Sequence, residues 1–189
     1  MFAWERCAVL FSTVSLEPLS STTRRDPSDL KIRIITTGGT IDKIYFDATS
    51  TYEVGAPQVV PVLTEANVSF EYVVEQACQK DSLELTDEDR ADIRRRVLAA
   101  PERCILITHG TDTMTETAKC LADIPDKVIV FTGAMAPARF RASDAPFNFG
   151  CAIAAVQLAA PGVYIAMNGR VFPGASVRKN REKGRFEPI

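Results

Sequence analysis

The amino-acid sequence predicts an α/β fold, in which a doubly wound, mainly parallel sheet of five strands lies between two layers of helices. Short apolar runs that suit buried strands alternate, from Leu30 onward, with stretches that carry helix start and stop signals. Two of these runs end in glycine and threonine, "TTGGT" at 36–40 and "THGTDT" at 108–113. With 189 residues, the chain is long enough for one domain with a full core.

Five segments are expected to be strands, because each is short, apolar and rich in β-branched residues. They are 30–36, 68–76, 104–108, 127–132 and 163–167. Strands that alternate with helices favour right-handed crossovers. The flavodoxin-like order 2-1-3-4-5 makes the first and third strands neighbours, and ligands bind beyond their carboxyl ends. The two stretches of glycine and threonine should therefore face each other across one crevice.

Three helices are expected between these strands. Residues 86–100 begin with threonine and acidic residues and stop before a proline, as helices commonly do. Residues 113–123 begin with a T-x-x-E capping box. Residues 144–160 begin with aspartate, with a proline in the first turn. Residues 42–57 contain no such signals, and a long irregular segment of this kind is typical of a lid or binding loop.

Composition and charge exclude several classes of function. The net charge of −2 gives no drive toward nucleic acid or an anionic membrane, and no apolar run approaches the roughly 20 residues of a membrane span. Five scattered cysteines without a C-x-x-C pair favour reduced thiols and a cytoplasmic location. With one histidine, His109, we expect no metal site.

The amino-terminal 28 residues differ from the rest of the chain. A mildly apolar stretch is followed by one rich in Ser, Thr, Pro and Arg, without the positive start and A-x-A cleavage site of a signal peptide. We therefore expect residues 1–28 to be a disordered extension, and residues 29–189 to form the folded domain.

The glycine-rich turn after the first strand suits two kinds of chemistry. Phosphate binding would need a G-x-x-x-x-G-K-[ST] or G-x-G-x-x-G pattern, and neither occurs. Nucleophilic catalysis by threonine fits better, because a hydroxyl at a strand-to-loop junction is exposed and free backbone N–H groups there can hold an oxyanion. Each threonine taken alone is more often an ordinary turn residue. His109 could serve as a base, although a lone histidine after a strand is more often structural.

Several motifs together resemble the amino-terminal domain of the L-asparaginase/glutaminase family, and in particular its short, single-domain members. The two central motifs are "TGGTID" at 37–42 and "HGTDTM" at 109–114. Supporting matches are "YEVG" at 52–55, "GAM" at 133–135, "DAPFNF" at 144–149 and "VRKN" at 177–180. The resemblance covers residues 30–180 and implies a chain without the smaller carboxyl-terminal domain that larger members carry.

The resemblance also implies catalytic roles. Thr40 would be the nucleophile that attacks a side-chain amide, with Tyr52 as its partner on a flexible loop. Tyr45 competes with Tyr52 for that position. Thr111, Asp112 and Lys179 would form a second catalytic set. By composition alone, Lys179 belongs to a basic tail, residues 177–185, which would be solvated, would form a short RNA-binding patch, or would fold back over the crevice.

The substrate-binding residues implied by the resemblance are Gly39, Ser82, Glu84, Thr111 and Asp112. Asp112 would hold the α-ammonium of L-asparagine and Ser82 its α-carboxylate, and the products would be L-aspartate and ammonia, without a cofactor. L-Glutamine is a possible second substrate. We expect a homo-oligomer, because a neighbouring subunit could exclude water from an open site.

Two other functions remain open at this stage. One is the amidase subunit of a tRNA-dependent amidotransferase, which would pass ammonia to a partner. The other is a non-catalytic module that binds an amino acid. Retention of Thr40, Thr111, Asp112 and Lys179 argues against the second.

Overall fold

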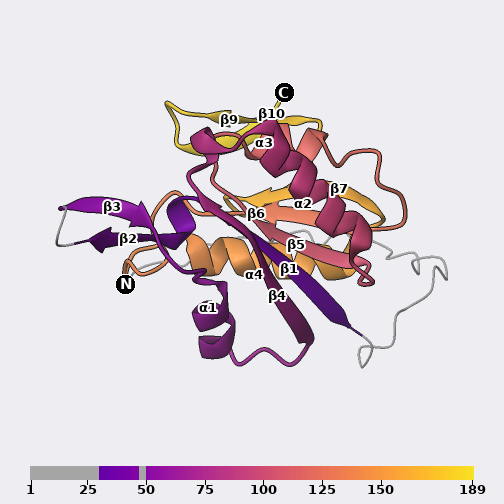
Figure 1. Ribbon diagram of the computed structural model, residues 1–189, viewed down its shortest axis with the longest axis horizontal. Helices are drawn as coiled ribbons and strands as arrows, with labels where there is room; N and C mark the ends of the chain where they lie inside the picture. Colours follow the sequence, from indigo (N-terminus) through magenta and orange to yellow (C-terminus); the bar gives the residue numbers. More distant parts are fainter. Residues whose placement is uncertain (1–29, 47–49) are drawn as a thin grey trace, which may run out of the picture.

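The computed structural model describes residues 30–46 and 50–189, which form a six-stranded sheet covered by helices on both faces (Figure 1). The expected extension, residues 1–28, lies outside the described residues. The sheet has the order β4-β1-β5-β6-β7-β8, with β8 antiparallel to β7 and all other pairs parallel. Its strands are β1 (Lys31–Gly38), β4 (Glu71–Lys80), β5 (Cys104–Thr108), β6 (Val128–Thr132), β7 (Gly162–Met167) and β8 (Arg170–Pro173).

The parallel part of the sheet confirms the predicted order 2-1-3-4-5, whereas the sixth strand was not predicted. The turn between β7 and β8 consists of Asn168 and Gly169, whose φ angles are 53° and 75°. An Asn-Gly pair between two apolar strands is a strong hairpin signal, because both turn positions need positive φ. This signal was present in the sequence and identifies β8.

The core consists of two apolar layers, one on each face of the sheet. On β1, Ile34 packs toward α1 (Val59–Glu65) and α4 (Ala145–Leu158). The next residue, Ile35, packs toward α2 (Asp87–Ala99) and α3 (Met114–Lys119), because successive side chains of a strand point to opposite faces. Every residue of β5 and β6 is buried, which is why both read as continuous apolar runs.

The helix starts agree only partly with the predicted caps. α2 begins as expected, because the Thr86 hydroxyl accepts from the N–H of Asp89 and the Asp89 carboxylate accepts from the N–H of Thr86. The capping box predicted at Thr113 is wrong: its hydroxyl donates instead to the Ser82 carbonyl at 2.7 Å. Glu116, the other member of that box, forms an ion pair with an arginine of α2. α3 also ends earlier than expected.

Asp144 does not cap α4 with its side chain, although it is the residue that precedes the helix. Its carboxylate accepts hydrogen bonds from the N–H groups of Met135 and Ala136 at 3.0 Å, and from the amide of Asn148 at 2.8 Å. The carboxylate therefore fixes the loop that follows β6 to the first turn of α4.

Residues 42–57, which were expected to be irregular, and the basic tail each contain a hairpin. Within residues 42–57, β2 (Lys43–Phe46) pairs with β3 (Thr51–Val54), and this hairpin projects from the body of the protein (Figure 1). In the basic tail, β9 (Val177–Asn180) pairs with β10 (Arg185–Pro188) close to α3. Val177 and Phe186 anchor this second hairpin, because both are buried in the core layer of α2 and α3. Of the alternatives given for the tail, the structure agrees with the one in which it folds back, because Lys179 contacts Thr111 and Asp112.

Candidate active site

The two glycine-containing turns are in direct contact. Thr36 of β1 lies opposite Thr108 of β5, and the Thr37 hydroxyl donates to the Thr108 carbonyl at 3.0 Å. Gly39 has a φ of 87°, and a Cβ at this position would lie 2.4 Å from the Cα of Gly110. A side chain at position 39 would therefore push the turns apart, so glycine is required there. The expected meeting of the two motifs is a feature of the structure.

Thr40 begins a short 3-10 turn, Thr40–Asp42, immediately after this contact. It is partly exposed, whereas the residues before and after it are buried. Thr40 thus lies on a short turn at the carboxyl end of β1 and is partly exposed. That combination is what a nucleophilic hydroxyl requires.

Lys179 reaches the second motif from the carboxyl-terminal hairpin. Its Nζ donates to the Thr111 hydroxyl at 2.7 Å and to Asp112 Oδ1 at 3.1 Å, across 68 and 67 residues of sequence. On the neighbouring strand, Phe186 lies opposite Lys179 in the hairpin register and is buried in the core. The lysine is therefore held in place by an apolar anchor, and its side chain is only 16% exposed.

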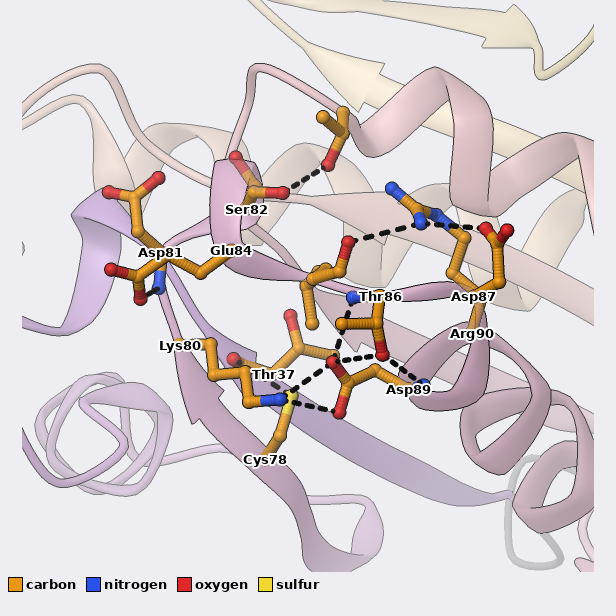
Figure 2. Close-up of polar contacts among 12 residues, drawn as sticks. Thr37, Cys78, Lys80, Asp81, Ser82, Glu84, Thr86, Asp87, Asp89 and Arg90 are labelled. Carbon is orange, nitrogen blue, oxygen red and sulfur yellow. Dashed lines mark hydrogen bonds and ion pairs between the residues drawn. The ribbon is translucent and has the colours of Figure 1, made fainter.

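Ser82 is the next site residue, and it packs against Gly110 of the second motif. It begins the 3-10 turn Ser82–Glu84 (Figure 2). The Asp81 carboxylate caps this turn by accepting from the N–H of Leu83. Ser82 is 2% exposed, and within the described chain its hydroxyl has no hydrogen-bond partner. A Cβ on Gly110 would lie 2.6 Å from that hydroxyl, so Ser82 packs directly against the turn before Thr111. A buried hydroxyl without a partner is well suited to a polar ligand.

Glu84 is placed differently from Ser82. It is exposed, and its carboxylate accepts from the N–H of Asp81 at 3.3 Å, which completes the capping box of the turn (Figure 2). The Glu84 side chain therefore stabilises the turn Ser82–Glu84. Ion pairs fix the same turn from both sides: Lys80 with Asp89, and Lys43 with Asp81, each at 2.7 Å.

His109 is a structural residue rather than an accessible base. It is fully buried, with Nδ1 2.7 Å from the Gly110 carbonyl and Nε2 2.8 Å from the Thr117 hydroxyl. Both contacts are satisfied if Nδ1 donates and Nε2 accepts. Burial lowers the pKa of His109 to about 4, so the ring is neutral at pH 7. The hydrogen bond to the Gly110 carbonyl supports the turn that precedes Thr111.

Tyr45 and Tyr52 are opposite each other on the projecting hairpin, and both are about half exposed. Their rings lie 5.4 Å apart, edge to face. The centroid of the Tyr52 ring also lies 6.0 Å from that of Phe140. Phe140 belongs to the loop that the Asp144 carboxylate fixes. This contact connects Tyr52 to the body of the domain. The sequence alternative between the two tyrosines stays open.

Asp42, the last residue of "TGGTID", is a polar residue that the sequence patterns did not single out. It is 2% exposed, its Oδ1 accepts from the N–H of Gln58 at 2.7 Å, and its carbonyl accepts from the N–H of Gly55 at 2.8 Å. Oδ2 has no partner among the described residues, and burial raises the pKa of Asp42 to about 7. Asp42 therefore joins the turn of Thr40 to the base of the hairpin.

Metal-binding clusters and membrane-spanning helices are both missing from the described residues. Across residues 30–46 and 50–189, no group of three His, Cys, Asp or Glu side chains could hold a metal ion. In the same part of the chain, no helix is long and apolar enough to cross a membrane.

Comparisons with known proteins agree with this geometry. The family model "Asparaginase, N-terminal" matches residues 31–186. L-asparaginase 2 of Escherichia coli is 36% identical over 164 residues, which cover 78% of this chain and 46% of that protein. A glutamyl-tRNA(Gln) amidotransferase subunit of Archaeoglobus fulgidus is 32% identical over 82% of this chain and 40% of that protein.

A solved structure, the thermostable L-asparaginase from Thermococcus kodakarensis, superposes with a TM-score of 0.70 at 29% identity. The match covers 85% of this chain and 51% of that chain. This chain therefore spans about half the length of the relatives that it matches.

Proposed function

The chain belongs to the asparaginase family, in the part that corresponds to its amino-terminal domain, and we propose that it hydrolyses L-asparagine to L-aspartate and ammonia. One observation carries the proposal. Lys179, from the end of the chain, donates to both Thr111 and Asp112 in the turn that touches the glycine before Thr40. A threonine hydroxyl, a second threonine, a carboxylate and an ammonium group are thus gathered at the ends of adjacent strands.

In the first step, the Thr40 hydroxyl attacks the side-chain amide carbon of the substrate. The new C–O bond gives a tetrahedral intermediate, whose oxyanion can be held by backbone N–H groups of the two glycine-containing turns. When the C–N bond breaks, ammonia leaves and an ester of Thr40 remains. Water then hydrolyses this ester, which releases L-aspartate and restores the hydroxyl.

The second catalytic set supplies protons to this sequence. The Lys179 ammonium donates to the Thr111 oxygen, which leaves the proton of Thr111 free to point toward the departing nitrogen. Asp112 accepts from Lys179 and so helps to hold its Nζ beside Thr111. In this proposal, Lys179 and Thr111 act as the general acid that turns an amide nitrogen into ammonia. Tyr52, or Tyr45 beside it, would relay the proton of Thr40, because its phenol passes its own proton to water as it accepts that of Thr40.

Substrate binding in the proposal follows from charge and burial. Asp112 is the anion for the α-ammonium group, and the buried Ser82 hydroxyl is a donor for the α-carboxylate. Gly39 would contact the substrate through its backbone, because Gly110 occupies the space where a Cβ would lie. Glu84, which caps its own turn, would affect the substrate through the position of Ser82.

The test is release of ammonia from L-asparagine and L-glutamine by the purified protein. We expect release from L-asparagine, and a loss of at least roughly 10³-fold in Thr40→Ala, because no nucleophile would remain. The matched control is Thr64→Ala, since Thr64 is an exposed threonine at the end of α1. Absence of release by the wild type, or equal rates in the two variants, would refute the proposal.

A second candidate is an amidase that supplies ammonia to a partner enzyme. The relative named as an amidotransferase subunit, at 32% identity, favours this reading. A relative named glutaminase-asparaginase, from Acinetobacter glutaminasificans at 31% identity, favours activity on both amides. A preference for L-asparagine over L-glutamine in the same assay would support the first candidate.

We further propose that the folded unit of residues 29–189 acts as a homo-oligomer in the cytoplasm. The match to residues 31–186 supports the domain limits. Four cysteines without a disulfide in the described chain support a reducing compartment. Exposed rings on the projecting hairpin and on Phe140 support contact with a second copy. Light scattering of an active monomer at assay concentration would contradict the oligomer.

A further inference from the structure

Asp112 is bound by two cations at the same carboxylate oxygen. Oδ1 accepts from Lys179 Nζ at 3.1 Å and lies 3.2 Å from Arg181 Nη2. Lys179 lies on β9, and Arg181 is the first residue after it. Arg178, on the opposite face of β9, pairs with Glu187 instead. The local sum of charges at Asp112 is therefore positive.

The two cations are held very differently. Lys179 is 16% exposed and is also bound to Thr111, so it is a fixed part of the site. Arg181 is 69% exposed, lies where β9 gives way to the turn, and has Asp112 as its partner. An exposed pair of this kind is worth little and separates readily. Arg181 is thus the cation that can leave the carboxylate.

An incoming α-ammonium group would compete with Arg181 for the Asp112 carboxylate. In the proposed function, Asp112 is the anion that receives this group. A carboxylate already facing two cations attracts a third cation weakly, and the approaching ammonium is repelled by the guanidinium at close range. Release of Arg181 from Asp112 therefore favours binding of the substrate's ammonium group.

We infer that Arg181 is a specificity-determining residue, whose guanidinium covers Asp112 in the ligand-free protein and exchanges with the α-ammonium of the substrate. The inference rests on the proposed function, since it takes Asp112 as the ammonium site. The exchange lowers affinity for every ligand that carries an α-ammonium group and leaves affinity for ligands without one unchanged. In this inference, Arg181 takes no part in the chemical steps.

The test compares ligands that differ only in the α-ammonium group. Binding of L-aspartate and of succinate, which has the same two carboxylates without the amine, is measured by calorimetry with the full chain. We expect Arg181→Gln to tighten L-aspartate binding by about 2- to 5-fold, the range of an exposed ion pair, and to leave succinate unchanged. Arg178→Gln is the matched control, because it removes an equally exposed cation from the same hairpin.

Kinetics give a second reading of the same variants. Arg181→Gln should lower KM for L-asparagine by a similar factor with little change in kcat, and KM for succinamate, which lacks the amine, should not change. Weaker binding of both ligands would show that Arg181 holds a carboxylate, and would overturn the inference. Equal affinities in wild type and both variants would overturn it as well.

Failure of the inference and failure of the proposed function have different signatures. Ammonia release that is lost in Thr40→Ala, together with no effect of Arg181→Gln, would refute the role of Arg181 alone. If no ammonia is released and L-aspartate binds none of the proteins, both statements are wrong. If L-aspartate binding responds to Arg181→Gln in a protein that releases no ammonia, the ammonium site stands and the hydrolase does not.

Discussion

Replacement of Asp42 by asparagine should change how the stability of the protein depends on pH. The Asp42 carboxylate is buried, with Oδ1 bound to the N–H of Gln58 and Oδ2 without a partner in the described chain. Lys43, the next residue, pairs with Asp81, and Arg139 donates to the side chain of Gln58. Burial raises the pKa of Asp42 from 3.8 to about 7.

The sign of the effect follows from this rise. The stabilising contribution of protonated Asp42 is complete below the unfolded pKa, near pH 4, and is lost as pH rises through the folded pKa of about 7. At about 1.4 kcal/mol for each pKa unit, the upper limit of the loss is roughly 4 kcal/mol. In Asp42→Asn, the amide oxygen can still accept from Gln58. Its buried NH₂ costs about 1–3 kcal/mol at every pH.

The measurement is urea unfolding of both proteins between about pH 4 and pH 7.5. The free energy of unfolding of the wild type, relative to Asp42→Asn, should fall steadily across this range. His109 acts in the opposite direction, since its pKa is lowered to about 4 and its contribution is lost as pH falls from 6.5. The difference between the two proteins cancels this effect, because both contain His109. A difference that is constant across the range would refute the reasoning.

Three further predictions concern the site. Thr40→Ser should retain part of the ammonia release that Thr40→Ala abolishes, because a hydroxyl remains; equal rates in both would contradict its role as nucleophile. Phe140→Ala removes the ring that contacts Tyr52, and such a contact between two rings is worth about 0.5–1.5 kcal/mol. Limited proteolysis within residues 43–54 should therefore become faster. Phe147→Ala, which removes another exposed ring, should leave the rate of proteolysis unchanged. His109→Gln should lower the free energy of unfolding by about 1–3 kcal/mol with less than roughly 10-fold loss of kcat; a larger loss at unchanged stability would identify a catalytic base.

The parallel sheet could be predicted from the sequence because buried strands have a direct signature. β5 and β6 are apolar at nearly every position, and α2 has a start that the sequence shows. The order of the strands then brings the Thr40 turn and the Thr111 turn together. The meeting of the two motifs is therefore a consequence of topology, which local patterns are sufficient to specify.

Elements that depend on tertiary contacts could not be predicted in the same way. The Thr113 hydroxyl binds the Ser82 carbonyl, 31 residues away, in preference to the nearby backbone. α1 begins after Gln58 without a side-chain cap, so it has no start signal. The position of Lys179 depends on the burial of Val177 and Phe186, and composition alone describes it as part of a basic tail.

The unpartnered oxygen of Asp42 and the second cation on Asp112 also lie outside any sequence pattern. Both depend on which side chains the fold brings within about 3 Å of a carboxylate. Neither feature corresponds to a fixed spacing of residues along the chain, so no sequence motif could predict it.

The most direct test of the account is the rate of ammonia release from L-asparagine by Lys179→Met and Lys183→Met. Each change removes one cation from the carboxyl-terminal hairpin region, but only Lys179 contacts Thr111 and Asp112, whereas Lys183 is exposed. A general acid typically contributes about 10²–10⁴-fold, so Lys179→Met should lose at least roughly 10²-fold in kcat, while Lys183→Met should match the wild type. Equal, mild effects of the two changes would contradict the account, because the contact of Lys179 with Thr111 and Asp112 would then have no part in catalysis.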